Sequence, residues 1–401
     1  MIILKDHFKS YIIHISIGHL FQKEMDVFSI LLDQYLKASH PTFLTRKEIS
    51  VALEDMYGLK VSLYTTLEGN YLVHHLRAKM IQPQLVLDTQ LLNDVIDFIR
   101  KMLFHAEIKD EKRFTEEKSR LIHQYELIKD DKQSYIDYLY EEVLQKKILD
   151  IYSLDEKIEL LKKATLVDVK NYYEHVFKTS NVISFASGNF PDTDIKKIKN
   201  AFEHYEKGMI KPIFNTYPYH KEENIQLKMP INQAILHLGY MTNITYKDPK
   251  MTSLQIFNEL LGGHASSRLF HEIREKRGLC YSIYSYLNSN QGLLSISTGV
   301  DMTRLEETKT SIYNVLEHLK NHEISDDELV QTKDFMIHQI QTSLDRQSVY
   351  IQRAYRNHIY QEQYDLEARL KQIEGVTKED IKWIANHMTL ILTHQVVGET
   401  Q

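Results

Sequence analysis

The sequence is poor in residues that mark several classes of protein. Its 401 residues include a single cysteine, Cys280, with 13 glycines and 7 prolines. One cysteine excludes an internal disulfide framework and a cysteine-rich metal cluster. It is also typical of a reducing compartment, so we expect a cytoplasmic protein. The scarcity of glycine and proline argues against long disordered linkers.

The sequence also lacks the features of a membrane-spanning protein and of a nucleic-acid-binding protein. No apolar run approaches the roughly 20 residues that span a bilayer, and residues 1–18 alternate apolar and polar positions instead of forming the core of a signal peptide. The formal net charge of −6 provides no basic excess for nucleic acid. We therefore expect no membrane span and no nucleic-acid partner. The 43% of hydrophobic and 26% of charged residues are typical of a globular protein, and the length allows two domains.

The sequence repeats itself. Residues 58–65 (GLKVSLYT) recur as residues 278–285 (GLCYSIYS). In both copies a helix-like pattern precedes the glycine and an alternating, strand-like pattern follows it. A second pair supports the first, because Thr165 and Thr377 each open an amphipathic helix as an N-cap, with Asp three residues later, and each helix leads to a strand. Two similarities in the same order predict a duplicated domain.

The expected boundaries follow from this repeat. We assign residues 1–205 to the first domain, 206–226 to a polar connection that contains two prolines, and 227–401 to the second domain. Chance similarity between two amphipathic patterns is the alternative explanation.

The order of elements predicts the fold class. In the second half, 233–241 reads as a strand, 249–261 and 266–276 as helices, and 280–300 as a strand pair around a turn. Ser325 opens a capping box, from which a long helix is expected to run towards Tyr360. Strands and helix pairs without regular βαβ alternation indicate an α+β protein.

Residues 260–287 (LLGGHASSRLFHEIREKRGLCYSIYSYL) resemble the C-terminal-domain motif of the pitrilysin/insulinase superfamily of zinc peptidases. The resemblance is strongest to the branch that contains mitochondrial processing peptidase and small bacterial two-subunit enzymes, and it extends weakly over the whole chain. It implies two homologous, duplicated α/β-layered domains of the LuxS/MPP-like metallohydrolase fold in a clam-shell arrangement. The first strand is short for this family, so we expect the true start to lie upstream.

The same resemblance identifies a degenerate zinc site. Catalytic members carry H-x-x-E-H on a helix of the first domain and a distal Glu on a later helix, which together hold zinc and activate water. At the two His positions this sequence has Leu31 and Tyr35, at the catalytic Glu it has Gln34, and at the distal Glu it has Gln124. Leucine cannot ligate a metal and an amide is no general base, so we expect no metal or other cofactor in this chain.

A second functional element of the family is retained. Arg274 and Tyr281 match an Arg/Tyr pair that the family's C-terminal domain brings over the substrate, where it can stabilise a developing oxyanion. At the equivalent places of the first half stand Glu54 and Val61, so the fold itself does not require the pair. The alternative is a surface arginine beside an ordinary strand tyrosine. Gly262-Gly263 forms either a substrate-binding loop or the close of a helix.

Several isolated groups have simpler interpretations. His318 and His322 share one helical face and are expected to be solvated, because no acid accompanies them. His74 and His75 are neighbours in a strand and must point to opposite faces. Cys280 is expected to be a packed small residue and not a nucleophile.

Three functions remain open. The first is a non-catalytic subunit that dimerises with an H-x-x-E-H homologue, which supplies the zinc, and binds an unfolded peptide. By resemblance, such pairs process precursor or bacteriocin leader peptides. The second is a catalytically inert scaffold or peptide-binding protein. The third, a lone zinc enzyme with an unconventional site, lacks a ligand set of known spacing.

Overall fold

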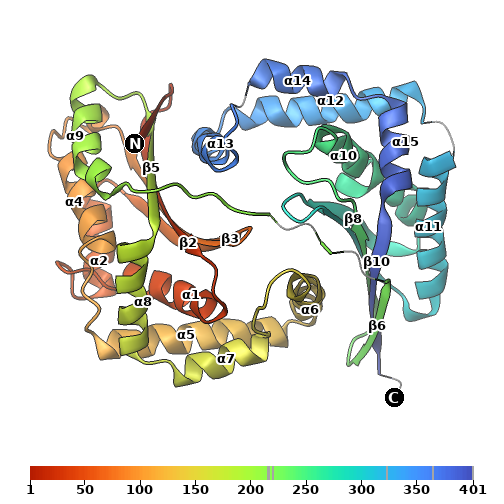
Figure 1. The fold of residues 1–401 in the computed structure, drawn as a ribbon, viewed down its shortest axis with the longest axis horizontal. Helices are drawn as coiled ribbons and strands as arrows, with labels where there is room; N and C mark the ends of the chain where they lie inside the picture. The colour runs from red at the N-terminus through yellow and green to blue at the C-terminus, as the bar shows by residue number, and fades with distance from the viewer. Residues whose placement is uncertain (215–216, 219–220, 322–323, 364, 400–401) are drawn as a thin grey trace. The chain divides into compact units, whose positions relative to one another are not determined.

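The structure, a computed structural model, describes residues 1–401 except 215–216, 219–220, 322–323, 364 and 400–401 (Figure 1). The chain forms two compact units. The first unit comprises Met1–Leu127, Ile151–Ile213 and Leu344–Gln363, and the second comprises Ile128–Asp150, Phe214–Ser343 and Tyr364–Gln401.

The first unit is a five-stranded sheet with helices. In chain order its elements are β1 (Ile2–Lys5), β2 (Ser10–Leu20), α1 (Lys23–Ala38), α2 (Arg46–Asp55), β3 (Lys60–Glu68), β4 (Tyr71–Ile81), α3 (Pro83–Val86), α4 (Leu91–Leu103), α5 (Glu111–Asp130), α7 (Leu154–Lys163), α8 (Leu166–Thr179), β5 (Asn181–Gly188), α9 (Asp192–Phe202), the 3-10 turn η1 (Glu203–Tyr205) and, from late in the chain, α13 (Gln347–Tyr360). The strand order is β1-β5-β2-β4-β3, with β1 parallel to β5 and the other neighbours antiparallel.

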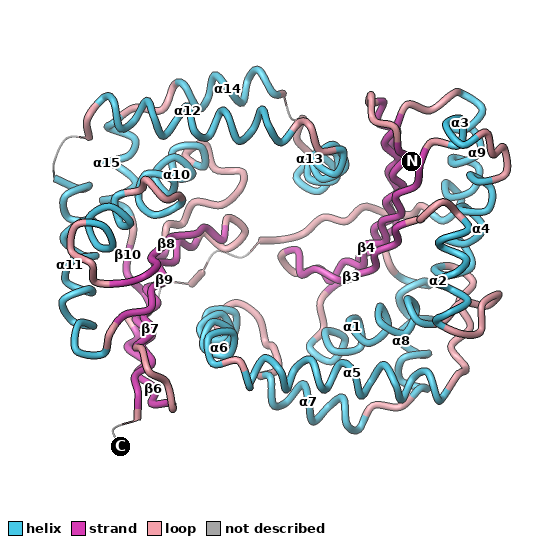
Figure 2. The backbone as a smooth tube through the Cα atoms, turned by 180° about the vertical axis from the view of Figure 1, so that it is seen from behind, coloured by secondary structure: helices cyan, strands magenta, loops and turns pink. Residues whose placement is uncertain are grey.

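The second unit repeats this plan. Its elements are α6 (Lys132–Lys146), β6 (Glu223–Met229), β7 (Ala234–Met241), α10 (Met251–Asn258), the π-helices η2 (Glu259–Gly263) and η3 (Phe270–Glu275), β8 (Cys280–Asn288), β9 (Leu293–Val300), the 3-10 turn η4 (Met302–Arg304), α11 (Leu305–Asn321), α12 (Asp326–Ser343), α14 (Leu366–Glu374), α15 (Lys378–His387) and β10 (Thr389–Gly398). The strand order β6-β10-β7-β9-β8 has β6 parallel to β10 and otherwise antiparallel pairs, so the two sheets in Figure 2 share one topology. The predicted α+β fold with two similar units is confirmed.

The internal repeat is visible at the level of single hydrogen bonds. Gly58 and Gly278 both adopt a positive φ (72° and 56°) that glycine tolerates best, and both end a helical segment before an edge strand. The N–H of Gly58 donates to the carbonyl of Glu54 (3.3 Å), as the N–H of Gly278 does to the carbonyl of Arg274 (3.1 Å). Thr165 and Thr377 both form the predicted capping boxes. Glu54 and Arg274 are therefore structurally equivalent positions.

Two predicted helices have different bounds in the structure. The N–H of Glu328 bonds the Ser325 hydroxyl as expected (3.1 Å), but the helix ends at Ser343 and does not run on to Tyr360. The helix expected from Ser266 contains the π-helix η3. Strand β6 begins at Glu223, within the stretch expected to connect the domains, and residues 215–216 and 219–220 of that stretch lie outside the described residues.

Two helices each pack on the sheet that is formed by the other half of the chain. Helix α6, from the first half of the chain, buries Ile136, Tyr140 and Leu144 against the second sheet. Helix α13, from the second half, lies against β5 and β1 of the first sheet. Each buried set recurs every four residues, as expected of one helix face. The exchange thus gives each unit one helix from the other half of the chain.

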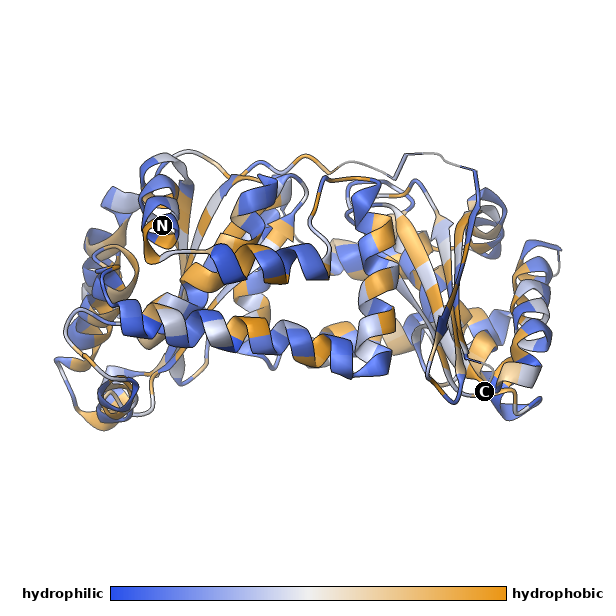
Figure 3. Ribbon diagram, turned by 90° about the horizontal axis from the view of Figure 1, so that it is seen from below, coloured by the Kyte–Doolittle hydropathy of each residue, from blue (hydrophilic) through white to orange (hydrophobic). Residues whose placement is uncertain are grey.

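Hydrophobic residues dominate the strands of the second sheet, whereas the helices carry a hydrophobic and a hydrophilic face (Figure 3). The core of the second unit joins β7, β9 and β10 to α10, α11 and α15. Among the described residues, no helix has both the length and the apolar character of a membrane-spanning segment.

Candidate functional site

The positions equivalent to the zinc-binding histidines belong to the core of the first unit. Leu31 and Tyr35 lie one turn apart on α1 and are both fully buried. The Tyr35 hydroxyl accepts hydrogen bonds from the backbone N–H groups of Lys109 and Asp110 at 3.3 and 3.1 Å. These two side chains fill space and tie α1 to the segment before α5.

The two glutamines of the degenerate site contact each other. The Gln34 amide on α1 donates to the Gln124 carbonyl oxygen on α5 at 2.8 Å, although 90 residues separate them. Gln34 Oε1 is enclosed and has no hydrogen-bond partner among the described residues. The structure thus brings Gln124 to Gln34, where the family's distal Glu and general base would stand.

These residues do not fit a zinc ion. A leucine, a buried tyrosine and two amides offer neither the neutral imidazoles nor the carboxylates that zinc prefers. Across the described parts of the chain, no group of three or more His, Cys, Asp or Glu side chains is arranged to hold a metal. No chemical step in this chain is therefore assigned to a metal.

In the second unit, Arg274 and Tyr281 contact each other. The Arg274 guanidinium carbon lies 5.3 Å from the centre of the Tyr281 ring, within the range of a cation–π contact. Arg274 comes from η3 and Tyr281 from the start of β8, and η3 packs against β8. The Tyr281 side chain is 82% exposed, so its hydroxyl is available to a ligand.

A β-bulge turns Tyr281 outwards. Cys280 pairs with Val300 and Ser282 with Gly299, which leaves Tyr281 without a partner in the ladder. In the first sheet the equivalent Val61 pairs regularly with Ala78. Bulges redirect a side chain locally and are frequent next to active sites. The bulge is thus a property of the second sheet alone and coincides with the tyrosine that the family motif singles out.

A third side chain completes this group. Arg274 also lies over the Phe270 ring, with its guanidinium carbon 4.3 Å from the ring centre. Contact with aromatic rings through its face leaves the planar edge of a guanidinium able to hydrogen-bond a ligand. Phe270 is not among the site residues predicted from the sequence. Its separation of four residues from Arg274 could have indicated this contact.

Gly262 has a packing role. A β-carbon at Gly262 would lie 2.7 Å from both the backbone nitrogen and the hydroxyl of Ser285 on β8, so the helix approaches the strand more closely than any other residue would permit. Gly262 is buried, whereas the neighbouring Gly263 is exposed. Of the pair, only Gly263 is open to a peptide.

Replacing Gly262 by alanine should destabilise the second unit by about 2 kcal/mol, because η2 or β8 must shift to relieve the overlap. Urea unfolding of Gly262→Ala measures this loss. Gly299→Ala is the matched control, since a β-carbon there meets only a side-chain atom at 3.7 Å. Equal stability of both variants and the wild type would show that the close approach is relieved without cost.

Unpaired polar atoms surround Gly263. Glu259 Oε2 and His264 Nε2 are buried without hydrogen-bond partners among the described residues. Burial raises the pKa of Glu259 and lowers the pKa of His264, so both tend towards the neutral form. A β-carbon at Gly263 would lie 2.8 Å from Glu259 Oε2. Such groups suit the N–H and C=O groups of a peptide, and π-helices are often found at functional sites. No sequence pattern had indicated them.

Other residues singled out from the sequence have structural partners. His74 bonds Asp33 (2.7 Å) on one face of the sheet, and His75 bonds His14 (3.1 Å) on the other, as predicted for neighbours in a strand. Burial raises the pKa of the Cys280 thiol, which disfavours the reactive thiolate. His318 is exposed on α11, as predicted for a solvated helix face.

His318 also has a polar partner, because its Nδ1 receives a hydrogen bond from the Arg268 guanidinium at 3.0 Å. Its sequence neighbour on the predicted face, His322, lies outside the described residues.

Comparison with known proteins supports one family. Residues 163–336 match the family description "Peptidase M16 inactive domain". The "Probable inactive metalloprotease YmfF" of Bacillus subtilis is 26% identical over 358 residues, which cover 86% of this chain and 83% of that protein. The "Uncharacterized zinc protease YmxG" of the same species is 27% identical over 308 residues, 74% of this chain and 72% of the relative.

Solved structures share the fold over the full length. A conserved protein from Enterococcus faecalis superposes with a TM-score of 0.90 at 22% identity, over 100% of this chain and 96% of that one. A peptidase M16 inactive domain from Pseudomonas fluorescens gives a TM-score of 0.80 at 16% identity, over 100% and 95%. Residues 163–336 thus match the peptidase M16 inactive domain, and most of the chain is similar to the inactive and uncharacterized zinc-protease homologues of this family, whose fold it shares.

Proposed function

We propose that this chain is the non-catalytic subunit of a heterodimeric zinc peptidase. Its partner would be a homologous chain with an intact H-x-x-E-H motif, which supplies the zinc, and Arg274 and Tyr281 would contact the peptide bond under attack. The observation that carries the proposal is the exposed Arg274–Tyr281 contact on a bulge that the first sheet lacks.

The chemistry of the pair fits this role. A guanidinium and a phenol both donate hydrogen bonds, and donors directed at the carbonyl oxygen stabilise the negative charge that develops on it. The substrate would be an unfolded peptide, such as a precursor or bacteriocin leader segment. The exposed Gly263 and the unpaired Glu259 and His264 offer hydrogen-bonding groups to its backbone. The single cysteine favours the cytoplasm for the complex.

The test is peptide hydrolysis by this chain co-expressed with a homologue that carries H-x-x-E-H. Activity should require both chains. It should fall by roughly 10² to 10³ in Arg274→Ala and in Tyr281→Phe, because each variant removes donors to the oxyanion. Tyr57→Phe, an exposed tyrosine of the first unit, is the matched control and should retain full activity. Unchanged rates in both site variants would exclude a shared catalytic site.

A catalytically inert scaffold or peptide-binding protein is the second candidate. It is favoured by the loss of every residue of the zinc site, in which Leu31 and Tyr35 have become core residues. The same experiment separates the two candidates. If this chain is a scaffold, it would still bind the peptide or the partner. Arg274→Ala would then leave the partner's rate of peptide cleavage unchanged.

A further inference from the structure

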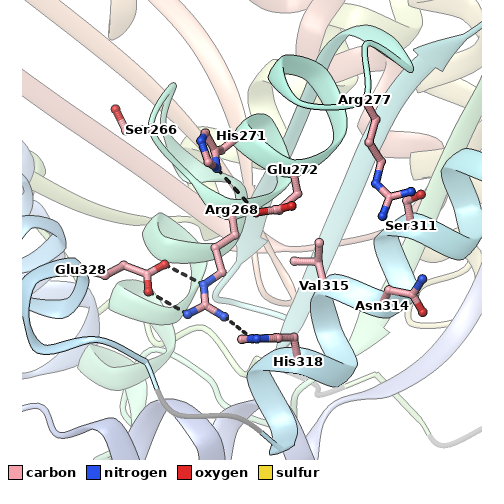
Figure 4. Close-up of a pocket in the computed structure, with 10 residues that line it drawn as sticks. All are labelled: Ser266, Arg268, His271, Glu272, Arg277, Ser311, Asn314, Val315, His318 and Glu328. Carbon is pink, nitrogen blue, oxygen red and sulfur yellow. Dashed lines mark hydrogen bonds and ion pairs between the residues drawn. The ribbon is translucent and has the colours of Figure 1, made fainter.

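The second unit contains a cavity of about 500 Å³ that the proposed peptidase role does not use. It lies between one face of α11, the segment from Ser266 to Arg277, and the first turn of α12 (Figure 4). The α11 side chains that line it are Ser311, Asn314, Val315 and His318, which share one helix face by their spacing. Neither Arg274 nor Tyr281 lines this cavity.

An ordered ion pair lines one side of the cavity. Arg268 donates through Nε and a terminal nitrogen to the two carboxylate oxygens of Glu328, at 2.6 and 2.7 Å, and through its other terminal nitrogen to His318 Nδ1 at 3.0 Å (Figure 4). The bidentate pair fixes the guanidinium. Because Nδ1 of His318 accepts from a cation, the ring carries its proton on Nε2 and acts as a donor there.

Among the described residues that line the cavity, one cation is left without a compensating charge. Glu328 is neutralised by Arg268, and Glu272 is paired with Lys276 at 2.7 Å, which lowers the pKa of Glu272. Arg277 is exposed, and among the described residues its guanidinium has neither an ion pair nor a hydrogen bond. The Asn314 carboxamide is likewise exposed on α11. A free guanidinium with amide and imidazole donors nearby favours a negatively charged ligand.

The size of the cavity indicates an organic ligand. Its volume lies in the range of roughly 300–1,000 Å³ that holds small molecules, and it exceeds what an inorganic anion would fill. Val315 gives the wall an apolar part. We propose that this cavity binds a small organic anion, whose carboxylate or phosphate group pairs with Arg277 while its body packs against α11. This site is independent of peptide cleavage.

The test is calorimetric titration of the full chain with three aromatic probes of similar shape. Benzoate and phenyl phosphate carry the two candidate anionic groups, and benzamide is the neutral match. Binding of either anion in the low-millimolar range, with no binding of benzamide, is the expected result. Whichever anion binds more tightly identifies the preferred group. Failure of both anions to bind, or equal binding of benzamide, overturns the proposal.

Variants locate the site. Arg277→Gln should weaken binding of the preferred anion at least about tenfold, because it removes the charged donor from an exposed position without disturbing the core. Lys309→Gln removes one positive charge from α11 at a residue that does not line the cavity, and it should leave the affinity unchanged. If both variants weaken binding equally, the probes respond only to net charge and the assigned site is wrong.

Discussion

The free energy of unfolding is expected to fall steeply as the pH drops from about 6.5 to about 5, because buried histidines resist protonation. Burial lowers the pKa of His75 to about 3 and the pKa values of His19 and His394 to about 4, and it holds the pKa of His14 well below its usual range. In the unfolded chain these groups protonate near pH 6.5. The unfolded state then binds more protons than the folded state, so acid favours unfolding.

The size of the effect follows from this difference. For a histidine whose folded pKa is 4 or lower, the loss at pH 5 is about 2 kcal/mol relative to neutral pH. The stabilisation is fully present above pH 6.5 and is lost as the pH falls towards the folded pKa values. Three carboxyl groups oppose the trend, because burial raises the pKa values of Glu68, Glu141 and Glu259. The folded state binds these protons more readily than the unfolded state does, which offsets part of the loss caused by the histidines.

The hydrogen bonds around His14 and His75 explain why protonation of these two rings is unfavourable in the folded state. His14 Nε2, His75 Nδ1 and the Ser16 hydroxyl lie 3.1 Å from one another. The hydrogen bond between the two rings needs an acceptor nitrogen on one of them, and protonation of both rings would set N–H groups against each other. Arg77 adds a further positive charge nearby that lowers both pKa values.

Urea unfolding at a series of pH values measures this dependence. His123→Gln removes an exposed histidine on α5 and should leave the profile as it is in the wild type. His75→Gln removes one titrating group, so its stability should depend less steeply on pH even if it is lower at pH 7. A wild-type profile that is flat between pH 7 and 5 would contradict the assignment of these histidines as neutral.

The repeated arrangement of helices and strands could be predicted because local sequence patterns mark it. Gly58 and Gly278 each end a helix by left-handed geometry, and Thr165 and Thr377 each cap one, so both copies could be aligned residue by residue. The equivalence of Glu54 and Arg274 followed from that alignment. The contact between Gln34 and Gln124 matches positions inferred from the family motif, not from any local pattern.

The features that the sequence could not predict depend on contacts between residues that are far apart along the chain. Periodicity tells which face of α6 or α13 is buried, but not which of two similar sheets receives it. The bulge at Tyr281 is defined by its pairing with β9, and Arg268 meets His318 from 50 residues away. A histidine that appears isolated along a helix therefore gained a cationic partner only when the chain folded.

Gln347 anchors the exchanged helix α13, and its replacement by methionine is expected to destabilise the first unit by about 3 kcal/mol. The side chain is buried at 3% exposure. Its amide nitrogen lies 2.7 Å from the carbonyl oxygen of Ser10, 3.2 Å from that of Ser187 and 3.1 Å from the Asp6 carboxylate, and its oxygen accepts from the Ser10 hydroxyl at 2.6 Å. Methionine keeps the volume but removes all four hydrogen bonds, and a buried or part-buried group left without a partner costs about 1–3 kcal/mol.

Hydrogen exchange along residues 347–360 is the appropriate measurement, because two units can unfold separately and a single global midpoint would mix them. In Gln347→Met the backbone amides of α13 should exchange faster than in the wild type, by a factor that corresponds to the lost stability. Gln352→Met makes the same chemical change at an exposed position of the same helix and should change exchange little. Equal protection in both variants would mean that the apolar face, with Ile351 and Tyr355, holds α13 on the first sheet without help from the glutamine. The four hydrogen bonds would then follow the docking of the helix and would not determine it.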